Sequence, residues 1–346
     1  MIRFNLTPKL LIFNYVMDDS NPIFAHQAQT VESLSSYFDE ITVLTGKVGR
    51  FQNKSNVNVI STQWIPGHTA RNVCRFYIKV VPFLFRRDTQ IFSHMTEVQS
   101  DLIAPFTRLL RIRHYLWYAH TSNSIFLKWC HIWTSGIITS TSGSCPIKGS
   151  KVYPIGQGVD SSKFLPIQTT SILYKISFLH FGRFDPSKNI KEILETCHAL
   201  RENGREVHFT QIGTPSTKHH ENEASQVRAE FNDCDWVTFL PSILRENIPN
   251  EMKKHSAFIH AYRGSLDKTL IESTLLAIPV ITVNPEYIKI FGSWSGRQNP
   301  SLLEECRSFL NENIVHISQE TERRRKIAEI NHSLDNWTRT VANFFK

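Results

Sequence analysis

The chain has 346 residues, of which 41% are hydrophobic and 20% charged, so it is long enough for two ordinary domains and is neither disordered nor fibrous. Its six cysteines are scattered without C-x-x-C spacing, which argues against a zinc site or a disulfide framework and favours a reducing, cytoplasmic compartment. Residues 1–168 hold 17 Lys and Arg against 9 Asp and Glu, whereas residues 169–346 hold 22 of each. We therefore expect the first half to face an anionic partner or surface.

The first half alternates short apolar segments with longer amphipathic ones, a pattern typical of a parallel sheet with helices on both faces. Its longest apolar runs are strand-sized, well short of the roughly 20 residues that a membrane-spanning helix needs. The predicted strands are 10–16, 41–45, 57–62, 90–94, 115–119, 136–140 and 151–155, and the predicted helices are 26–38, 70–87 and 98–110.

The helix predicted at 70–87 has a basic face, because Arg71, Arg75 and Lys79 recur every four residues. An amphipathic helix that covers its own sheet explains this pattern, and so does a helix that docks on an anionic membrane surface. Elsewhere on the helix lie the apolar residues Val73, Phe76, Tyr77, Val80 and Leu84.

The second half repeats the alternation after a polar connection at 158–171, and we place the domains at 1–167 and 168–346. A helix with Ile190 and Leu200 on one face stops at Asn203-Gly204. The terminal segment 317–345 is predicted to be helical and to pack back on the first domain. The predicted strands are 175–181, 206–212, 236–240, 256–261 and 279–283.

Two Rossmann-like α/β domains in tandem place a ligand in the crevice between them, at the carboxyl ends of the strands. Two segments of the second domain suit that position. The first runs from Phe181 to Asn189, where Arg183 and Lys188 could hold a diphosphate and neutralise charge as it departs. Alone, such a cation pair is more often solvated surface.

The second segment runs from Tyr262 to Glu272 and predicts a strand, a tight loop and a helix. Ser265 is the expected N-cap, and the Gly264-Ser265 loop would present backbone N–H groups to an anion or a sugar hydroxyl. Glu272, further along the helix, would accept hydrogen bonds from a diol. Together the two segments predict a nucleotide-sugar pocket.

With these segments, the chain resembles the GT-B glycosyltransferases of family 4, the large group of retaining nucleotide-sugar enzymes. The resemblance implies two Rossmann-like domains facing a cleft, with the acceptor on the first and the donor on the second. The matching segments are Gly182-Arg183 with Lys188, Gln211-Ile212-Gly213, Trp236 to Leu240, Gly264 to Glu272 with Pro279-Val280, and Ile155 to Asp160 with Phe164.

The resemblance also implies roles for single residues. Arg183 and Lys188 would bind the donor diphosphate and Glu272 the ribose, while Gly182 and Gly213 would border the donor. The backbone from Gly264 through Ser265 and Leu266 to Asp267 would hold the transferred sugar. The family often has a further glutamate where this chain has Gly264, and Asp267 is the alternative for that role.

In the first domain, His120 follows a strand where the family often carries a histidine that contacts the reacting sugar. A structural histidine in a strand-end turn explains the same position equally well. Asp233-Cys234-Asp235 spells the D-x-D of metal-dependent glycosyltransferases of another fold, but it precedes a strand, at the amino end, so we predict no metal site.

The sequence thus predicts a metal-independent, retaining glycosyltransferase without a cofactor, whose substrate is a nucleotide-sugar donor. The expected acceptor is a glycan or lipid-linked molecule of cell-envelope polysaccharide synthesis, with no nucleic acid as partner, in the cytoplasm or peripherally on the inner membrane face. The alternatives are a nucleotide-sugar epimerase and a non-catalytic GT-B binding or scaffold protein. Gly264 favours the second alternative, and so does the first loop, 18–22, which lacks the family's glycine pair.

Overall fold

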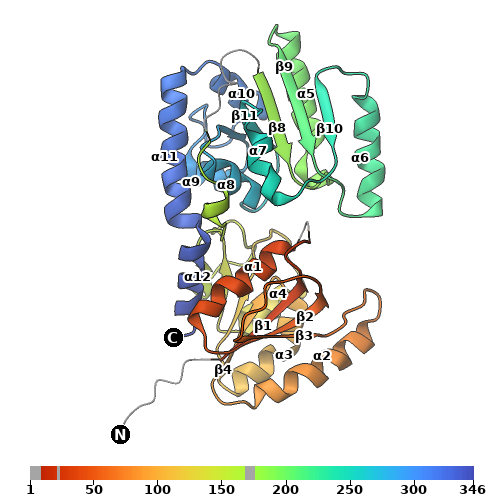
Figure 1. Ribbon diagram of the computed structural model, residues 1–346, viewed down its shortest axis with the longest axis vertical. Coiled ribbons are helices and arrows are strands. Elements are labelled where there is room, and N and C mark those ends of the chain that lie inside the picture. The colour runs from red at the N-terminus through yellow and green to blue at the C-terminus, as the bar shows by residue number, and fades with distance from the viewer. Residues whose placement is uncertain (1–8, 22–23, 168–175) are drawn as a thin grey trace. The chain divides into compact units, whose positions relative to one another are not determined.

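The computed structural model describes residues 9–21, 24–167 and 176–346 (Figure 1). The chain divides into two compact units, one formed by residues 1–158 with 334–346 and the other by residues 159–333. The unit boundary thus falls between Gly158 and Val159, whereas the sequence suggested 167/168. The polar segment 168–171, the first residue of the strand predicted at 175–181 and Pro22 of the first loop lie outside the described residues.

The first unit is built on a seven-stranded parallel sheet with the order β3-β2-β1-β4-β5-β6-β7. Strand β1 is buried along nearly its whole length, as expected for a parallel sheet covered on both faces. Every one of these strands overlaps a predicted one. They are β1 Lys9–Met17, β2 Ile41–Val48, β3 Val57–Ser61, β4 Thr89–His94, β5 His114–Trp117, β6 Gly136–Thr139 and β7 Val152–Pro154.

Helices cover the two faces of this sheet in separate layers. Leu10 and Ile12 of β1 pack with α1 and α12, whereas Leu11 and Phe13, which point the other way, pack with α2 and α3. Helix α4, which the sequence analysis did not predict, covers β5 and β6 beside α3. The helices are α1 Ala25–Leu34, α2 Thr69–Leu84, α3 Glu97–Leu109, α4 Ile125–Trp133 and α12 Leu334–Asn343.

The second unit is built on a five-stranded parallel sheet with the order β10-β9-β8-β11-β12. Its two faces are covered by two apolar clusters, one involving α5 and α10 and the other α7, α8 and α9. The strands are β8 Ile176–Phe181, β9 Val207–Ile212, β10 Val237–Leu240, β11 Ala257–His260 and β12 Val280–Thr282; the helices are α5 Ile190–Glu202, α6 Lys218–Glu230, α7 Ile248–Met252, α8 Lys268–Leu275, α9 Pro285–Phe291, α10 Leu302–Leu310 and α11 Ile314–His332.

The helical segment predicted at 317–345 is two helices and not one. Ser333, with extended backbone angles, ends α11. Helix α12 then buries Trp337 and Val341 against the first sheet, where the ring centroids of Trp337 and Trp117 lie 5.0 Å apart. Burial of these apolar side chains holds α12 on the first sheet. None of the helices in the described ranges combines the length and apolar character needed to cross a bilayer.

Candidate functional site

The second sheet has a topological switch point between β8 and β11, because the chain moves to opposite sides of β8 in its two halves. Open parallel sheets bind ligands at such points, beyond the carboxyl ends of the strands. The loop after β8 leads to Asn189 and the loop after β11 begins at Ala261. The Asn189 side chain ties the two together by donating from Nδ2 to the Ala261 carbonyl over 3.2 Å.

Lys188 and Asp267 form a largely buried ion pair across these two loops. The Lys188 ammonium also lies 4.3 Å from the ring centroid of Tyr262, so an aromatic face supports the cation. Burial raises the pKa of Asp267, but Lys188 and His260 outweigh burial and hold that pKa well below its usual range. The carboxylate is therefore ionised at neutral pH and fixes the position of the Lys188 ammonium.

A buried chain of hydrogen bonds through His260 and Thr282 holds Asp267 in position. His260 is fully buried, and burial lowers its pKa, so the ring is neutral at pH 7. Its Nε2 lies 3.4 Å from Asp267 Oδ2 and its Nδ1 3.2 Å from Thr282 Oγ1. A neutral ring satisfies both contacts by donating to the carboxylate and accepting from the hydroxyl.

Arg183 sits at the same edge of the sheet but is more exposed. Its Nη1 lies 3.0 Å from Asp185 Oδ2, and its side chain is 47% exposed. Asp185 is buried, and it also accepts hydrogen bonds from the Ser216 N–H and hydroxyl and from His220. Burial raises the pKa of Asp185, but the hydrogen bonds from Ser216 and the charge of Arg183 outweigh burial, so the net pKa is below its usual value. The carboxylate is therefore charged and orients the guanidinium.

Glu272 lies on the second turn of α8 and is 2% exposed. Its Oε1 pairs with Arg245 from the segment after β10, whereas Oε2 has no hydrogen-bond partner among the described residues. A buried carboxylate oxygen without a partner is costly, and a ligand hydroxyl would satisfy it. Lys268 begins the same helix; burial, and then the nearby Arg245, lower the pKa of Lys268 to about 7.

The loop at 262–267 differs from the prediction in two respects. The N-cap of α8 is Asp267, whose side chain accepts from the Thr269 N–H, and not Ser265. The Ser265 N–H donates to the Tyr262 hydroxyl over 3.2 Å, so this backbone donor already has a partner. A Cβ at Gly264 would lie 1.9 Å from the same hydroxyl, so Tyr262 occupies the space that a side chain at 264 would need.

Asn284, at the end of β12, holds this loop in place. It is fully buried, and its Nδ2 lies 3.0 to 3.2 Å from the carbonyls of Tyr262, Gly264 and Ser265. Its Oδ1 accepts from the Tyr287 N–H and caps α9. One side chain therefore fixes both the loop and the next helix.

We predict that Asn284→Ala destabilises the second unit by about 2 kcal/mol, because it removes an N-cap and leaves buried carbonyls without their donor. Thermal unfolding followed by circular dichroism measures the loss. The matched control is Asn203→Ala, an exposed position after α5 whose change should cost much less. Equal melting temperatures for the two variants would refute a holding role for Asn284.

Gly182 and Gly213 allow two backbone segments to approach each other closely beside the site. A Cβ at Gly213 would lie 1.9 Å from the Gly182 carbonyl oxygen, so the two backbones meet too closely for a side chain. Their N–H groups extend the sheet by donating to Ile212 and Leu240. Gln211 donates to the Gly182 carbonyl and contacts the buried His180 ring at 2.7 Å, which braces the loop before Arg183.

His120 belongs to the first unit, in the loop after β5. Its ring is exposed, its Nδ1 accepts from the Ser122 N–H at 3.0 Å, and its edge contacts the Tyr118 ring. The position at the carboxyl end of a strand agrees with the sequence. Contact with a reacting sugar stays a prediction.

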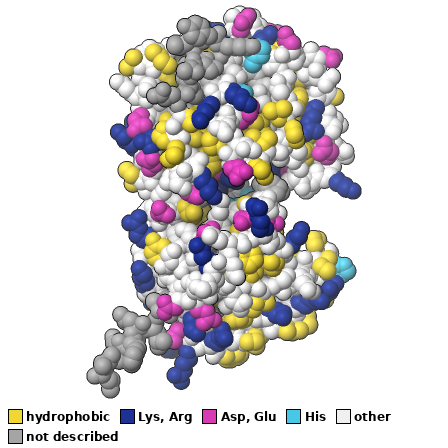
Figure 2. All heavy atoms as spheres, viewed as in Figure 1, with side chains coloured by type: hydrophobic (Ala, Val, Ile, Leu, Met, Phe, Trp, Pro, Cys, Tyr) yellow, Lys and Arg dark blue, Asp and Glu magenta, His cyan; other side chains and the backbone are white. Residues whose placement is uncertain are grey.

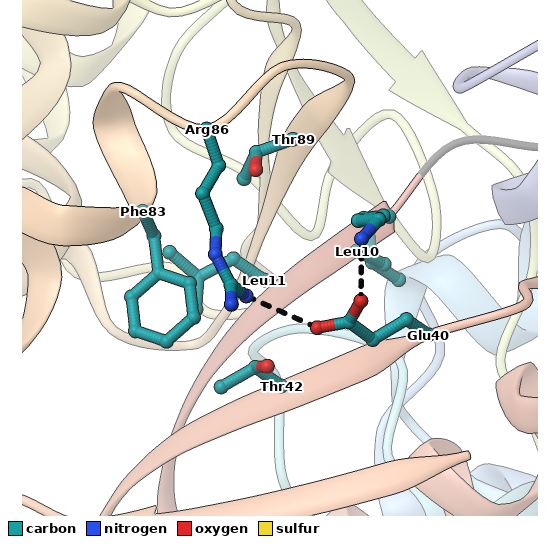
Figure 3. A pocket seen from close by; sticks show the side chains of 8 residues that line it. Leu10, Leu11, Glu40, Thr42, Phe83, Arg86 and Thr89 are labelled. Carbon is teal, nitrogen blue, oxygen red and sulfur yellow. Dashed lines mark hydrogen bonds and ion pairs between the residues drawn. The ribbon is translucent and has the colours of Figure 1, made fainter. Parts of the chain in front are cut away.

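Two other features, the Asp233 and Asp235 pair and a hollow in the first unit, are weaker candidates for a functional site. Asp233 and Asp235 precede β10, at the edge of the sheet opposite the two loops, and among the described residues no group of three or more His, Cys, Asp and Glu is placed to hold a metal ion. A shallow hollow in the first unit lies at the amino ends of β1, β2 and β4 (Figure 3). There Glu40 pairs with Arg86 at 3.1 Å and with Lys9 at 2.7 Å, so its own ion pairs occupy the hollow.

Sequence reasoning missed four residues that build the site: Tyr262, His260, Asn284 and Arg245. His260 and Asn284 had a usable signal, since each lies at the end of a predicted strand of a parallel sheet, where ligands and their supports gather. The pairing of Arg245 with Glu272 had none, because 27 residues separate them and only the fold brings them together.

Comparison with known proteins agrees with this geometry. Residues 175–290 match the family model of glycosyl transferases group 1. HepE from Anabaena, solved in complex with UDP and glucose, superposes with a TM-score of 0.74 at 15% identity, over 97% of this chain and 98% of that one. Sucrose-phosphate synthase from Thermosynechococcus elongatus superposes with a TM-score of 0.77 at 12% identity, over 98% of each chain.

At these identities the solved structures establish the fold, and no curated protein matches the chain in sequence. The family match covers the part of the candidate site that lies in the second unit, from β8 through the loop at 262–267 into α9. The chain therefore has the GT-B fold, and residues 175–290 of its second unit are similar to the glycosyl transferases group 1.

Proposed function

We propose that the protein is a retaining glycosyltransferase that moves a sugar from a nucleotide-sugar donor to a glycan or lipid-linked acceptor. The observation that carries the proposal is the cluster at the β8/β11 switch point. There Lys188, held by Asp267 and Tyr262, lies in the segment that matches a sugar-transferase family. The same segment holds a buried Glu272 oxygen that has no hydrogen-bond partner among the described residues. HepE binds UDP-glucose, which makes UDP-glucose the first donor to test.

In this proposal Arg183 and Lys188 bind the donor diphosphate and stabilise its charge as it leaves. Asp185 and Asp267 pre-orient the two cations, so little reorganisation is needed when the donor binds. Glu272 Oε2 accepts hydrogen bonds from the ribose while Arg245 holds Oε1. The loop from Gly264 to Asp267 borders the transferred sugar, and His120 of the first unit contacts it.

A panel of nucleotide sugars, scored for slow hydrolysis without acceptor, tests the proposal. Release of UDP and free sugar from one donor, stimulated by an acceptor, supports a transferase. Release of an epimerised sugar that no acceptor affects would identify an epimerase. Neither binding nor turnover of any donor would favour a scaffold protein.

We predict that activity does not depend on a divalent metal ion. Arg183, Lys188 and Arg245 supply positive charge at the site, so the leaving diphosphate needs no metal to neutralise it. Excess EDTA should leave the rate of donor hydrolysis within about twofold. Abolition by EDTA with rescue by Mn²⁺ would contradict the prediction and direct attention to Asp233 and Asp235.

The proposed setting is the cytoplasm, with the enzyme peripheral on the inner membrane face during cell-envelope polysaccharide synthesis. Support comes from the excess positive charge of residues 1–168. A lipid-linked acceptor lies at a membrane surface, and a basic protein concentrates at an anionic one.

A further inference from the structure

The first unit exposes large apolar side chains on three neighbouring helices. Ten of the seventeen exposed large hydrophobic residues in the described ranges lie on α2, α3, α4 and the residues that cap α2 and α3. Such clustering marks an interaction surface, whereas scattered single residues would not. The ten residues are Ile78, Val81, Phe85, Phe106, Leu109, Leu110, Ile125, Phe126, Trp129 and Ile132.

These three helices form one layer on one face of the first sheet. The Tyr77 hydroxyl of α2 donates to the Leu102 carbonyl of α3 over 2.7 Å. The Cys130 thiol of α4 lies 3.4 Å from the Glu97 carbonyl of α3. The outer sides of α2, α3 and α4 are therefore parts of one surface, here named the α2–α4 surface.

Helix α2 has two apolar faces. Phe76 and Val80 are buried against the sheet, whereas Ile78 and Phe85 lie on the opposite side, 64% and 74% exposed. Phe76, Val80 and Leu84, which the sequence placed away from the basic face, are all core residues, as expected for an amphipathic helix that covers its own sheet. The helix nevertheless keeps an outward apolar face beside its basic one.

Positive charge surrounds the α2–α4 surface. Residues 41–159 contain fourteen Lys and Arg against three acidic residues, Asp88, Glu97 and Asp101. In the space-filling view, hydrophobic and basic side chains lie next to one another over α2 and α3 (Figure 2). Those exposed on or just after the three helices are Arg71, Lys79, Arg86, Arg87, Arg108, Arg111 and Lys128.

We propose that the α2–α4 surface docks on an anionic lipid bilayer, with its apolar side chains inserted at the level of the headgroups. This deepens the membrane location proposed above by naming the surface, and it holds whichever donor the second unit binds. A mixture of apolar tips, including Trp129, with Lys and Arg is the composition of interfacial helices. A protein partner of the same complementarity would need an acidic apolar face, whereas the inner leaflet supplies both properties over any area.

Sedimentation of the full chain with phosphatidylglycerol vesicles tests the proposal. We expect binding that is strong at low salt, weak at high salt and weaker to phosphatidylcholine alone, because the Debye length falls from about 10 Å at 0.1 M to about 3 Å at 1 M. Reversing Arg71, Arg75 and Lys79 to Glu should weaken binding roughly 100-fold or more, because each Lys or Arg near the surface contributes a factor of up to about ten to the affinity. The apolar variant Ile78→Ser, Phe85→Ser, Leu109→Ser should weaken it roughly tenfold or more.

The matched control carries Ile314→Ser, Val315→Ser and Ile330→Ser, three exposed apolar positions on α11 of the second unit, and should bind vesicles like the parent. Equal binding by the α2–α4 variants and the parent would overturn the proposal. So would a dimer that the apolar variant dissolves without any vesicle binding, which would assign the surface to a second copy of the chain. Stabilisation by UDP, measured in parallel on each variant, reports on the donor site and separates a failure of membrane docking from a failure of the proposed function.

Discussion

Lys188→Ala is expected to cost the second unit both its activity and about 3–5 kcal/mol of stability. The side chain is 8% exposed and paired with Asp267, so its removal leaves a buried carboxylate without its cation. For a unit of this size the melting temperature should fall by roughly 10 °C. The sequence predicted that Lys188 holds the diphosphate but did not predict its burial against Asp267.

The double variant Lys188→Ala, Asp267→Ala separates the two effects. Removing both partners takes away the unpaired charge, so much of the stability should return while donor turnover stays low. The pair also has a pH signature. The pKa of Asp267 is lowered in the fold, so its contribution is present above its unfolded pKa of about 4 and is lost as the pH falls below it. Parent and double variant should therefore converge in melting temperature in acid; a constant difference down to low pH would contradict the ion pair.

Arg183→Ala is expected to lower donor turnover by about 10²–10³ while leaving the melting temperature nearly unchanged. The guanidinium is half exposed, and Asp185 keeps hydrogen bonds from Ser216 and His220 when Arg183 is removed. The change therefore removes a charge directed at the leaving group without exposing the core. Steady-state hydrolysis of the preferred nucleotide sugar measures the effect.

The matched control for that experiment is Arg205→Ala. Arg205 is also an exposed arginine of the second unit, but it precedes β9 and lies at the opposite edge of the sheet. Its loss should leave turnover within about twofold. A folded Arg183→Ala protein that turns over as fast as Arg205→Ala would remove Arg183 from the site.

Most of the fold was predictable because parallel strands buried on both faces give continuous apolar runs, as in Leu10 to Phe13 or Ala257 to Ile259. Helix α4 was not predicted because its sequence, Ile-Phe-Leu-Lys-Trp-Cys-His-Ile-Trp, is short and mostly apolar, and such a run does not distinguish a helix from a buried strand. The break at Ser333 was not predicted because local propensity favours one long helix, whereas the burial of Trp337 on the first sheet depends on the fold.

For the candidate site, the sequence predicted where the functional residues lie but not which residues they pair with. Arg183, Lys188 and Glu272 could be placed at strand and helix ends from spacing alone. The pairing of Lys188 with Asp267 joins residues 79 positions apart, and that of Glu272 with Arg245 joins residues 27 positions apart, so both depend on the fold. Likewise Gly264 looked like a lost glutamate in the sequence, whereas in the fold the Tyr262 hydroxyl fills its space.

Calorimetric titration of the full chain with UDP, GDP and ADP tests most directly whether the β8/β11 switch point holds a nucleotide diphosphate. The account predicts that one of the three binds at one site per chain, that the same nucleotide raises the melting temperature, and that Arg183→Ala weakens binding at least tenfold while Arg205→Ala does not. Absence of binding by all three nucleotides, or equal affinity in the parent and Arg183→Ala, would contradict it.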